Sequence, residues 1–245
     1  MPSLLFSIAI LIVAIISGGV AALSGFGIGS LVTPLLATAV GMKVAVAAVS
    51  VPHFVATCVR LWGLRKHVDR NVLLHFGILS AVGGLLGALF QWKANSPMLS
   101  VVFGCLLLFA GISGLAGWSE RMHFGHRTAW VAGALSGFFG GVVGNQGGIR
   151  SAALVGFQLS KEGLVATATA IGVIVDAARM PVYLATQGRA LFPIAIYIAL
   201  AIVGCLIGTF WGVRVLERIP TRWYKRVLSS LLCALGSYMS LKAFL

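Results

Sequence analysis

Eight long apolar stretches run through almost the whole chain, and they limit its fold more than any other feature. They cover residues 4–23, 44–61, 72–90, 99–116, 130–143, 164–183, 191–213 and 227–245. Most of them approach the roughly 20 residues that a helix needs to cross a bilayer. Only 9% of the residues are charged, whereas soluble domains carry roughly 25%. The pattern predicts an all-α integral membrane protein without a separate soluble domain.

The chain is strongly basic, with 18 lysines and arginines against 5 acidic residues. In a soluble protein this balance would suggest nucleic acid. Here the cations cluster in short segments between apolar stretches, so membrane topology explains them and nucleic acid is not an expected partner. The 4 cysteines lie singly inside apolar stretches, without the spacing of a metal site, so we expect neither a metal nor a cofactor.

A polar segment at 118–128 divides the chain into halves with four apolar stretches each. The second half can be aligned on the first. After a small insertion the alignment continues and pairs Gly83-x-x-x-Gly87 with Gly204-x-x-x-Gly208. The aligned pairs are Gly25 with Gly144, Gly29 with Gly148, Ala47 with Ala166, Arg60 with Arg179, and Arg70 with Arg189. The two arginine pairs and the shared order of stretches predict a duplication. The first repeat would span 1–118, the connecting loop 119–127 and the second repeat 128–245.

Loop charges predict the orientation, because lysine and arginine gather in cytoplasmic loops. Basic clusters lie at 60–70, 121–127 and 214–226, and all three should face the cytoplasm. Eight simple crossings cannot place them on one side. One element of the second half should therefore enter the membrane and turn back. The natural candidate is 128–160, which is interrupted at the glycine-rich residues 144–148.

The equivalent interruption in the first half lies at 25–29. Each half then holds a re-entrant or broken helical hairpin and three transmembrane helices, and an odd number of crossings inverts the second copy. Lys93 and a less basic loop at 179–189 should lie outside. The stretch 4–23 is long enough to cross completely, so the sequence leaves its depth open.

Glycine-rich interruptions at matching positions of two halves are the best sequence indication of a transporter's substrate site. Unwound backbone persists inside a membrane only where protein or a water-filled cavity satisfies its amides. A helix that starts after each interruption presents free N–H groups and a positive dipole end to an anion. Side chains that can add hydrogen bonds are Ser30, Thr33, Asn145, Gln146 and Ser151. The alternative is that the glycines only allow helices to cross closely.

Arg150 follows the second interruption directly. A guanidinium group at membrane depth is costly unless it serves a ligand, a partner or a cavity, and its forked donors suit an oxyanion. The alternatives are that Arg150 reaches an interface or pairs with Asp176.

Asp176 is the only carboxylate well inside a predicted span. Asp176 and Arg179 share a helix face, so they either neutralise each other or leave Asp176 as a proton-binding group in a coupled transport cycle. His53 lies inside the second apolar stretch and could relay protons near neutral pH. The alternative for His53 is a hydrogen bond to a neighbouring helix.

The sequence contains no complete enzyme motif among those considered, so no catalytic residue is expected. Gly111-Ile-Ser-Gly114 matches the GxSG of intramembrane serine proteases, but those need a histidine on a later helix and none follows His126. Metalloprotease and phosphate-binding loop motifs do not occur in the sequence.

Two segments carry a resemblance to a known family. They are 18–30 (GGVAALSGFGIGS), followed by Pro34, and 133–151 (GALSGFFGGVVGNQGGIRS). Together they resemble the paired SGxxGxGGG signature of the TauE/SafE sulfite exporter family, also called the toluene sulfonate uptake permease family. The resemblance extends over essentially the whole chain.

The resemblance implies secondary transport of sulfite or organosulfonates across a bacterial inner membrane. Carried over by position, it implies substrate-binding backbone at Gly25, Gly27, Gly29, Gly144, Gly147 and Gly148. The sequence departs from the family pattern at Phe26 and Ser30 in the first interruption and at Asn145 and Gln146 in the second.

We therefore expect a multi-pass transporter of small sulfur-containing anions, working by alternating access, with proton coupling left open. The alternatives are an anion channel and a non-transporting assembly or sensor subunit. Expected partners are the anion and membrane lipid, and the sequence is compatible with a homo-oligomer.

Overall fold

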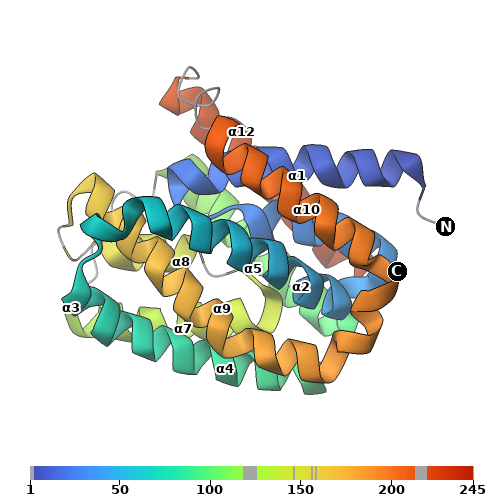
Figure 1. Cartoon of the computed structure of the whole chain (residues 1–245), viewed down its shortest axis with the longest axis horizontal. Coiled ribbons are helices and arrows are strands. Elements are labelled where there is room, and N and C mark those ends of the chain that lie inside the picture. The colour runs from blue at the N-terminus through green and yellow to red at the C-terminus, as the bar shows by residue number, and fades with distance from the viewer. Residues whose placement is uncertain are drawn as a thin grey trace.

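The computed structural model describes residues 3–117, 126–145, 147–155, 157, 159–212 and 220–244. Every regular element within these ranges is a helix (Figure 1). The longer helices are α1 (Leu4–Ser24), α2 (Ile28–Leu64), α4 (Ile78–Lys93), α5 (Ser96–Ala116), α7 (His126–Val143), α8 (Gly147–Val155), α9 (Lys161–Leu191), α10 (Ala195–Ile207) and α12 (Thr221–Lys242). The short ones are η1 (Arg65–His67), α3 (Arg70–Val72), η2 (Leu73–Gly77), η3 (Phe192–Ile194) and η4 (Gly208–Gly212).

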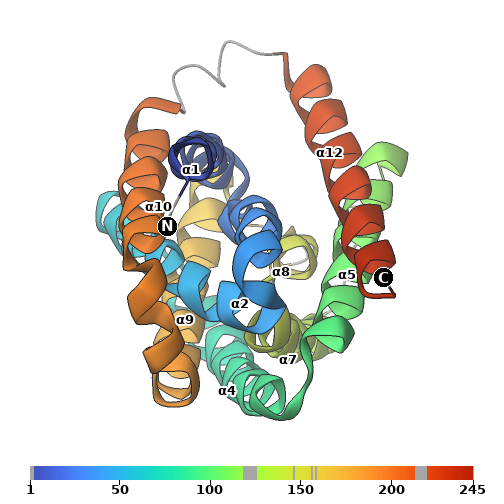
Figure 2. The same cartoon turned by 90° about the vertical axis from the view of Figure 1, so that its right-hand side faces the viewer.

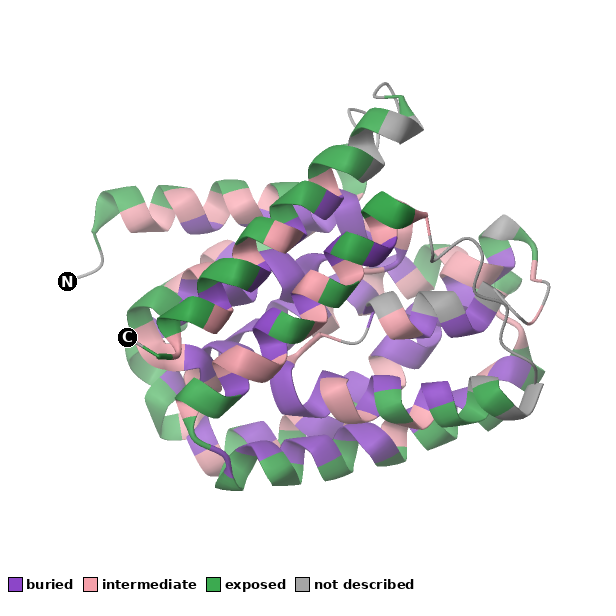
Figure 3. Ribbon diagram, turned by 180° about the vertical axis from the view of Figure 1, so that it is seen from behind, coloured by how far each residue is buried: buried purple, intermediate pink, exposed green. Residues whose placement is uncertain are grey.

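The distribution of polarity is that of a protein whose solvent is lipid. Five helical segments of the described chain are long and apolar enough to cross a membrane, and they are Leu4–Ser24, Ile28–His67, Arg70–Lys93, Ser96–Ala116 and Glu162–Trp211. Large apolar side chains such as Ile12, Val82 and Leu86 face outward, whereas Arg150 and Asp176 are buried. Figure 3 shows exposed residues on the outer helices and buried residues between them. The predicted all-α membrane fold is confirmed.

Both predicted interruptions are real helix ends. Gly25 (φ 77°) ends α1 and Gly144 (φ 75°) follows the last residue of α7, and this left-handed conformation favours glycine. Each glycine N–H bonds a carbonyl of the helix it closes, that of Ala21 and Gly140 respectively, at 2.9 Å. New helices start directly afterwards, so each half contains a helix that stops, turns and starts again.

A further interruption in the first half was not predicted. Gly41 has φ 76° and ψ 160°, which divides α2 into two helical parts, 28–40 and 42–64. The first part follows the turn at Gly25, as the short helix α8 follows the turn at Gly144.

Four helix pairs form most of the interior: α1 with α10, α4 with α7, α2 with α9 and α5 with α12. In Figure 2 the α1/α10 and α5/α12 pairs lie on opposite sides, and α2 and α8 lie between them. The first helix of each half thus packs on a helix late in the other half. The α2/α9 and α5/α12 pairs join matching helices of the two halves.

Small residues let these pairs approach closely, as is usual in membranes. A Cβ on Gly83 or Gly87 of α4 would lie 2.2 or 2.1 Å from a carbonyl oxygen of α7. A Cβ on Gly204 of α10 or on Gly208, the first residue of η4, would lie 2.9 or 2.0 Å from a carbonyl oxygen of α1. The two aligned glycine motifs therefore have the same packing role, each against the first helix of the other half.

Two predicted loop assignments are wrong. The sequence analysis took Arg60 as the start of a basic loop and 179–189 as a loop, but α2 continues to Leu64 and α9 to Leu191. The helices continue because Arg60 and Arg179 turn inward and are buried, instead of ending the apolar segment at water. Of the basic loops predicted at 121–127 and 214–226, residues 121–125 and 214–219 lie outside the described residues. Arg127 lies in α7, and Arg222, Lys225 and Arg226 lie in α12, so these parts of the predicted loops are helical.

Candidate functional site

The two interruptions contact each other in the middle of the helical assembly. A Cβ on Gly29 would lie 2.3 Å from the carbonyl oxygen of Gly144, and a Cβ on Gly147 would lie 1.9 Å from Cβ of Phe26. Each turn therefore packs against the first residues of the helix that follows the other turn. The N-termini of α2 and α8 converge at this crossing, as expected if the two interruptions form one site.

One side-chain hydrogen bond joins the two turns directly. Ser30 Oγ donates to Oδ1 of Asn145 over 3.3 Å. Thr33 Oγ1 is buried without a partner among the described residues. Gln146 lies outside the described residues, and the side chain of Ser151 is likewise not described. Gly148 lies in the first turn of α8.

Arg150 connects α8 to the first turn. It is 1% exposed, and its Nη2 donates to the carbonyl oxygen of Gly25 over 3.2 Å. Its Nε and Nη1 have no partner among the described residues. The Nη1 atom lies 3.3 Å from the position that a Cβ of Gly172 would occupy. The predicted alternative of a pair with Asp176 does not occur, because the Asp176 oxygens bind other groups.

Asp176 is fully buried between α9 and α2. His53 Nδ1 lies 2.5 Å from Oδ2 of Asp176. Arg179 places Nε at 3.0 Å and Nη2 at 2.7 Å from Oδ1 of the same carboxylate. The ion pair with Arg179 and the interhelical bond of His53 are therefore both present, whereas a role in proton coupling stays a prediction.

The same network reaches the second turn. Arg179 Nη1 donates to the carbonyl of Gly140, and the Tyr183 hydroxyl donates to that of Gly141. Both carbonyls belong to the last turn of α7, where carbonyl groups lack the usual helical donors; that of Gly140 also accepts the N–H of Gly144. Arg179 and Tyr183 thereby stabilise the end of α7 just before Gly144.

Arg60 is an interior residue that the sequence analysis missed as part of the site. It is 7% exposed, its Nε donates to Oγ1 of Thr169 over 3.1 Å, and its Nη1 has no partner among the described residues. The signal that could have revealed it was its alignment with Arg179, which lies well inside an apolar stretch of the second half.

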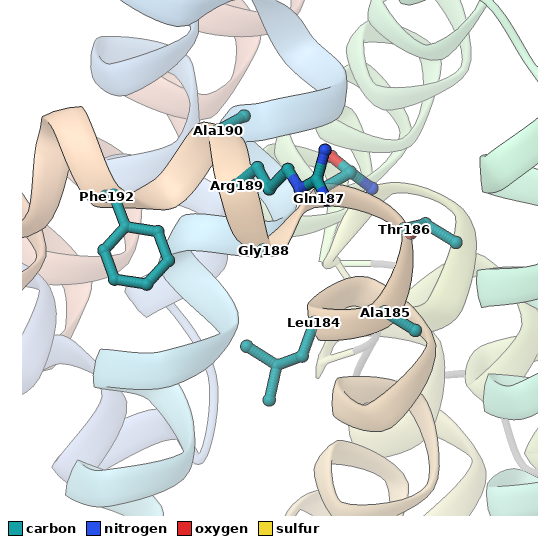
Figure 4. Close-up of a pocket in the computed structure, with 8 residues that line it drawn as sticks. All are labelled: Leu184, Ala185, Thr186, Gln187, Gly188, Arg189, Ala190 and Phe192. Atoms are coloured by element: carbon teal, nitrogen blue, oxygen red, sulfur yellow. The ribbon is translucent and has the colours of Figure 1, made fainter.

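A groove of about 730 Å³ lies at the C-terminal end of α9, away from the crossing (Figure 4). Its lining includes Gln187, Arg189 and Phe192 but none of the predicted site residues. Gln187 Nε2 donates to Oε1 of Gln91 over 2.8 Å. This polar group is therefore already used to join α9 to α4.

Fold and crossing together define a multi-pass membrane protein with broken helices that meet in its interior, an architecture found in secondary transporters. Residues 10–239 match the sequence model of the family described as Sulfite exporter TauE/SafE. The chain belongs to this family, which confirms the resemblance noted in the sequence. Comparison with curated proteins and with solved structures gave no match. Family membership implies transport of a sulfur-containing anion and agrees with a protein that is not an enzyme.

Proposed function

We propose that the protein is a secondary transporter that carries sulfite or an organosulfonate across the bacterial inner membrane by alternating access. The observation that carries this proposal is the contact between the two turns, with Arg150 bridging them. The site would use backbone at Gly25, Phe26, Gly27, Gly29, Gly144, Gly147 and Gly148, together with side chains of Ser30, Asn145, Gln146, Arg150 and Ser151.

The crossing offers hydrogen-bond donors and positive charge to which an anion can bind. Helix N-termini offer N–H groups and a positive dipole end, and they bind anions without a full buried charge. Arg150 adds a guanidinium group whose Nε and Nη1 atoms have no partner in the described part of the chain. A buried guanidinium group is costly unless something neutralises it. An oxyanion between the turns would satisfy both requirements.

Alternating access would use two inverted repeats, 1–118 and 128–245, joined by 119–127. Support comes from the helix pairs, because α1/α10 and α7/α4 relate the two halves in the same way. In such transporters one repeat or bundle moves against the other around a fixed site. Cysteine accessibility at Arg65 and Lys93 tests the orientation, since they should label from opposite sides.

Proton coupling would run through Asp176 and His53. The Asp176 carboxylate joins α2 to α9, and through Arg179 it is linked to the last turn of α7. Protonation of Asp176 would weaken its ion pair with Arg179. Arg179 would then be less firmly placed against the end of α7, next to the second turn.

Flux in proteoliposomes tests the proposal. The purified protein should take up labelled sulfite with saturable kinetics and accumulate it above the external concentration when a proton gradient is imposed. Empty liposomes are the control. Non-saturable flux without accumulation would instead indicate an anion channel, and no flux of any sulfur anion would indicate a non-transporting subunit.

A further inference from the structure

Helices α2 and α9 run antiparallel, and their contacts define three successive levels. Arg60 bonds Thr169 at the first level. At the second, the Thr57 methyl group lies 3.4 Å from the Cβ position of Gly172. At the third, His53 faces Asp176 at 2.5 Å.

The three levels differ in how their charges are balanced. At the third level Asp176 neutralises Arg179 through two short contacts. At the first and second levels lie the guanidinium groups of Arg60 and Arg150, with no carboxylate beside them among the described residues. Asp176 attracts both at longer range, but its two oxygens already bind His53 and Arg179.

The two unneutralised groups are neighbours. Arg60 contacts Thr169 and Arg150 lies against Gly172, and three helical residues span about 4.5 Å at the usual rise. Gly172 has no side chain, which leaves room for the Arg150 guanidinium group at this level. Arg60 and Arg150 repel each other electrostatically. Both are more than nine-tenths buried.

The buried interior therefore carries excess positive charge. Among the side chains that the structure describes, the buried arginines are Arg60, Arg150 and Arg179, and the buried carboxylate is Asp176 alone. Among the described residues, Arg60 Nη1 and Arg150 Nε and Nη1 have no hydrogen-bond partner. Two adjacent buried cations with free donors need a compensating anion, and a doubly charged one would neutralise both.

We infer that Arg60 is a substrate-binding residue, and that with Arg150 it makes the site select a divalent oxyanion of sulfur over a singly charged sulfonate. This inference rests on the proposed anion site and names its charge preference. Arg150 contributes to both classes of ligand, because it touches the crossing of the turns. Arg60 lies one level further along α2 and adds the second positive charge.

Equilibrium binding to the full-length purified protein tests this inference with two probes that share an SO3 group but differ in charge. Sulfite, at a mildly alkaline pH where it is doubly charged, and methanesulfonate both present three oxygens on sulfur. Wild type should bind sulfite at least about tenfold more tightly. Arg60→Gln should weaken sulfite binding by roughly 10-fold to 100-fold, as expected for a lost charged hydrogen bond. It should change methanesulfonate binding by no more than about threefold.

Arg65→Gln is the matched control, because it removes the same charge from an exposed residue just beyond the end of α2. It should leave both affinities unchanged. Arg60→Lys keeps the charge without the forked donors, so its sulfite affinity should be intermediate, and it provides a second variant if Arg60→Gln does not fold. Equal affinity of wild type for the two probes, or an equal effect of Arg60→Gln on both, would overturn the inference but leave the proposed function standing. If wild type bound neither probe, the proposed function itself would fail.

Discussion

Arg60 and Arg179 occupy aligned positions of the two halves and both turn into the protein interior, yet their surroundings differ. Arg179 has Asp176 one turn earlier on its own helix. The residue of the first half that aligns with Asp176 is Thr57, and the residue of the second half that aligns with His53 is Gly172. Among the described residues, the second half thus has a carboxylate beside its arginine, whereas the first half has none beside Arg60.

This difference distinguishes a structural role of Arg179 from the binding role that we propose for Arg60. Arg179 binds the Asp176 carboxylate and the Gly140 carbonyl at the end of α7. Within the part of the chain that the structure describes, Arg60 Nη1 has no partner, and neither do Nε and Nη1 of Arg150. Of the two aligned arginines, Arg179 therefore forms a fixed internal salt bridge, whereas we propose that Arg60, with Arg150, supplies charge for an incoming anion.

Replacing Arg179 and Arg60 by glutamine in turn should give the largest difference in folding stability. Arg179→Gln leaves a buried carboxylate without its main partner, which should cost about 3 kcal/mol of folding stability, the lower end for a broken buried pair, because His53 still faces Asp176. Arg60→Gln removes an unneutralised charge and one hydrogen bond, and should cost about 1 kcal/mol or less. Thermal unfolding of both variants in the same detergent measures the difference. Equal losses would show that the two environments are equivalent.

Removing Arg150 should affect binding more than stability. Arg150→Ala should weaken anion binding by roughly 1.5–3 kcal/mol, the value of a hydrogen bond to a charged group. Arg189→Ala is the control, because Arg189 lies on the exposed groove at the end of α9. Titration calorimetry of the folded variants provides the measurement. An unchanged affinity in Arg150→Ala would make Arg150 a purely structural link to Gly25.

The contact between the turns can be opened from the first half. In Gly29→Ala the new Cβ would meet the Gly144 carbonyl oxygen at 2.3 Å, and overpacking of this kind costs about 1–3 kcal/mol. Gly63→Ala on the same helix has nothing within 4 Å of its Cβ, so it should be neutral or stabilise by up to about 1 kcal/mol. Anion binding should be lost only in Gly29→Ala. Retained binding and stability there would mean that the turns need not touch.

A smaller effect on binding is expected at His53. His53→Gln keeps a hydrogen-bonding side chain opposite Asp176 but removes the ionisable imidazole, and should cost about 1 kcal/mol of folding stability. Sulfite flux should become less dependent on pH, while binding at a fixed pH changes little. Flux measured across a pH series in proteoliposomes checks this. A pH profile identical to that of wild type would leave Asp176 and His53 as structural partners only.

The sequence predicted those features that depend on local chemistry. Apolar runs of the right length predicted the helices, and the glycine-rich segments predicted the turns at Gly25 and Gly144 because few other residues adopt their backbone conformation. The aligned motifs Gly83-x-x-x-Gly87 and Gly204-x-x-x-Gly208 predicted a duplication, and their equivalent packing emerged only from the structure. The arrangement of the two turns against each other depends on packing between distant helices, so the sequence pattern could only suggest it.

Arg60 shows why the interior charges were harder to predict. An arginine at the end of an apolar run is usually taken as the point where a helix meets water, since such side chains are rarely buried without a partner. Here the helix continues to Leu64 and the guanidinium group points inward to Thr169. The sequence did not predict the interruption of α2 at Gly41. A single glycine in an apolar segment is not a distinctive pattern in a chain with 31 glycines.

The central claim is that the anion lies where the turns cross. An experimental structure of the protein soaked with selenite, a selenium analogue of sulfite, would locate the ligand by its anomalous scattering. We expect one peak within hydrogen-bonding distance of the Arg150 guanidinium group and of backbone N–H groups at the starts of α2 and α8. A peak only in the groove beside Arg189, with the crossing unoccupied under conditions that support transport, would contradict the account.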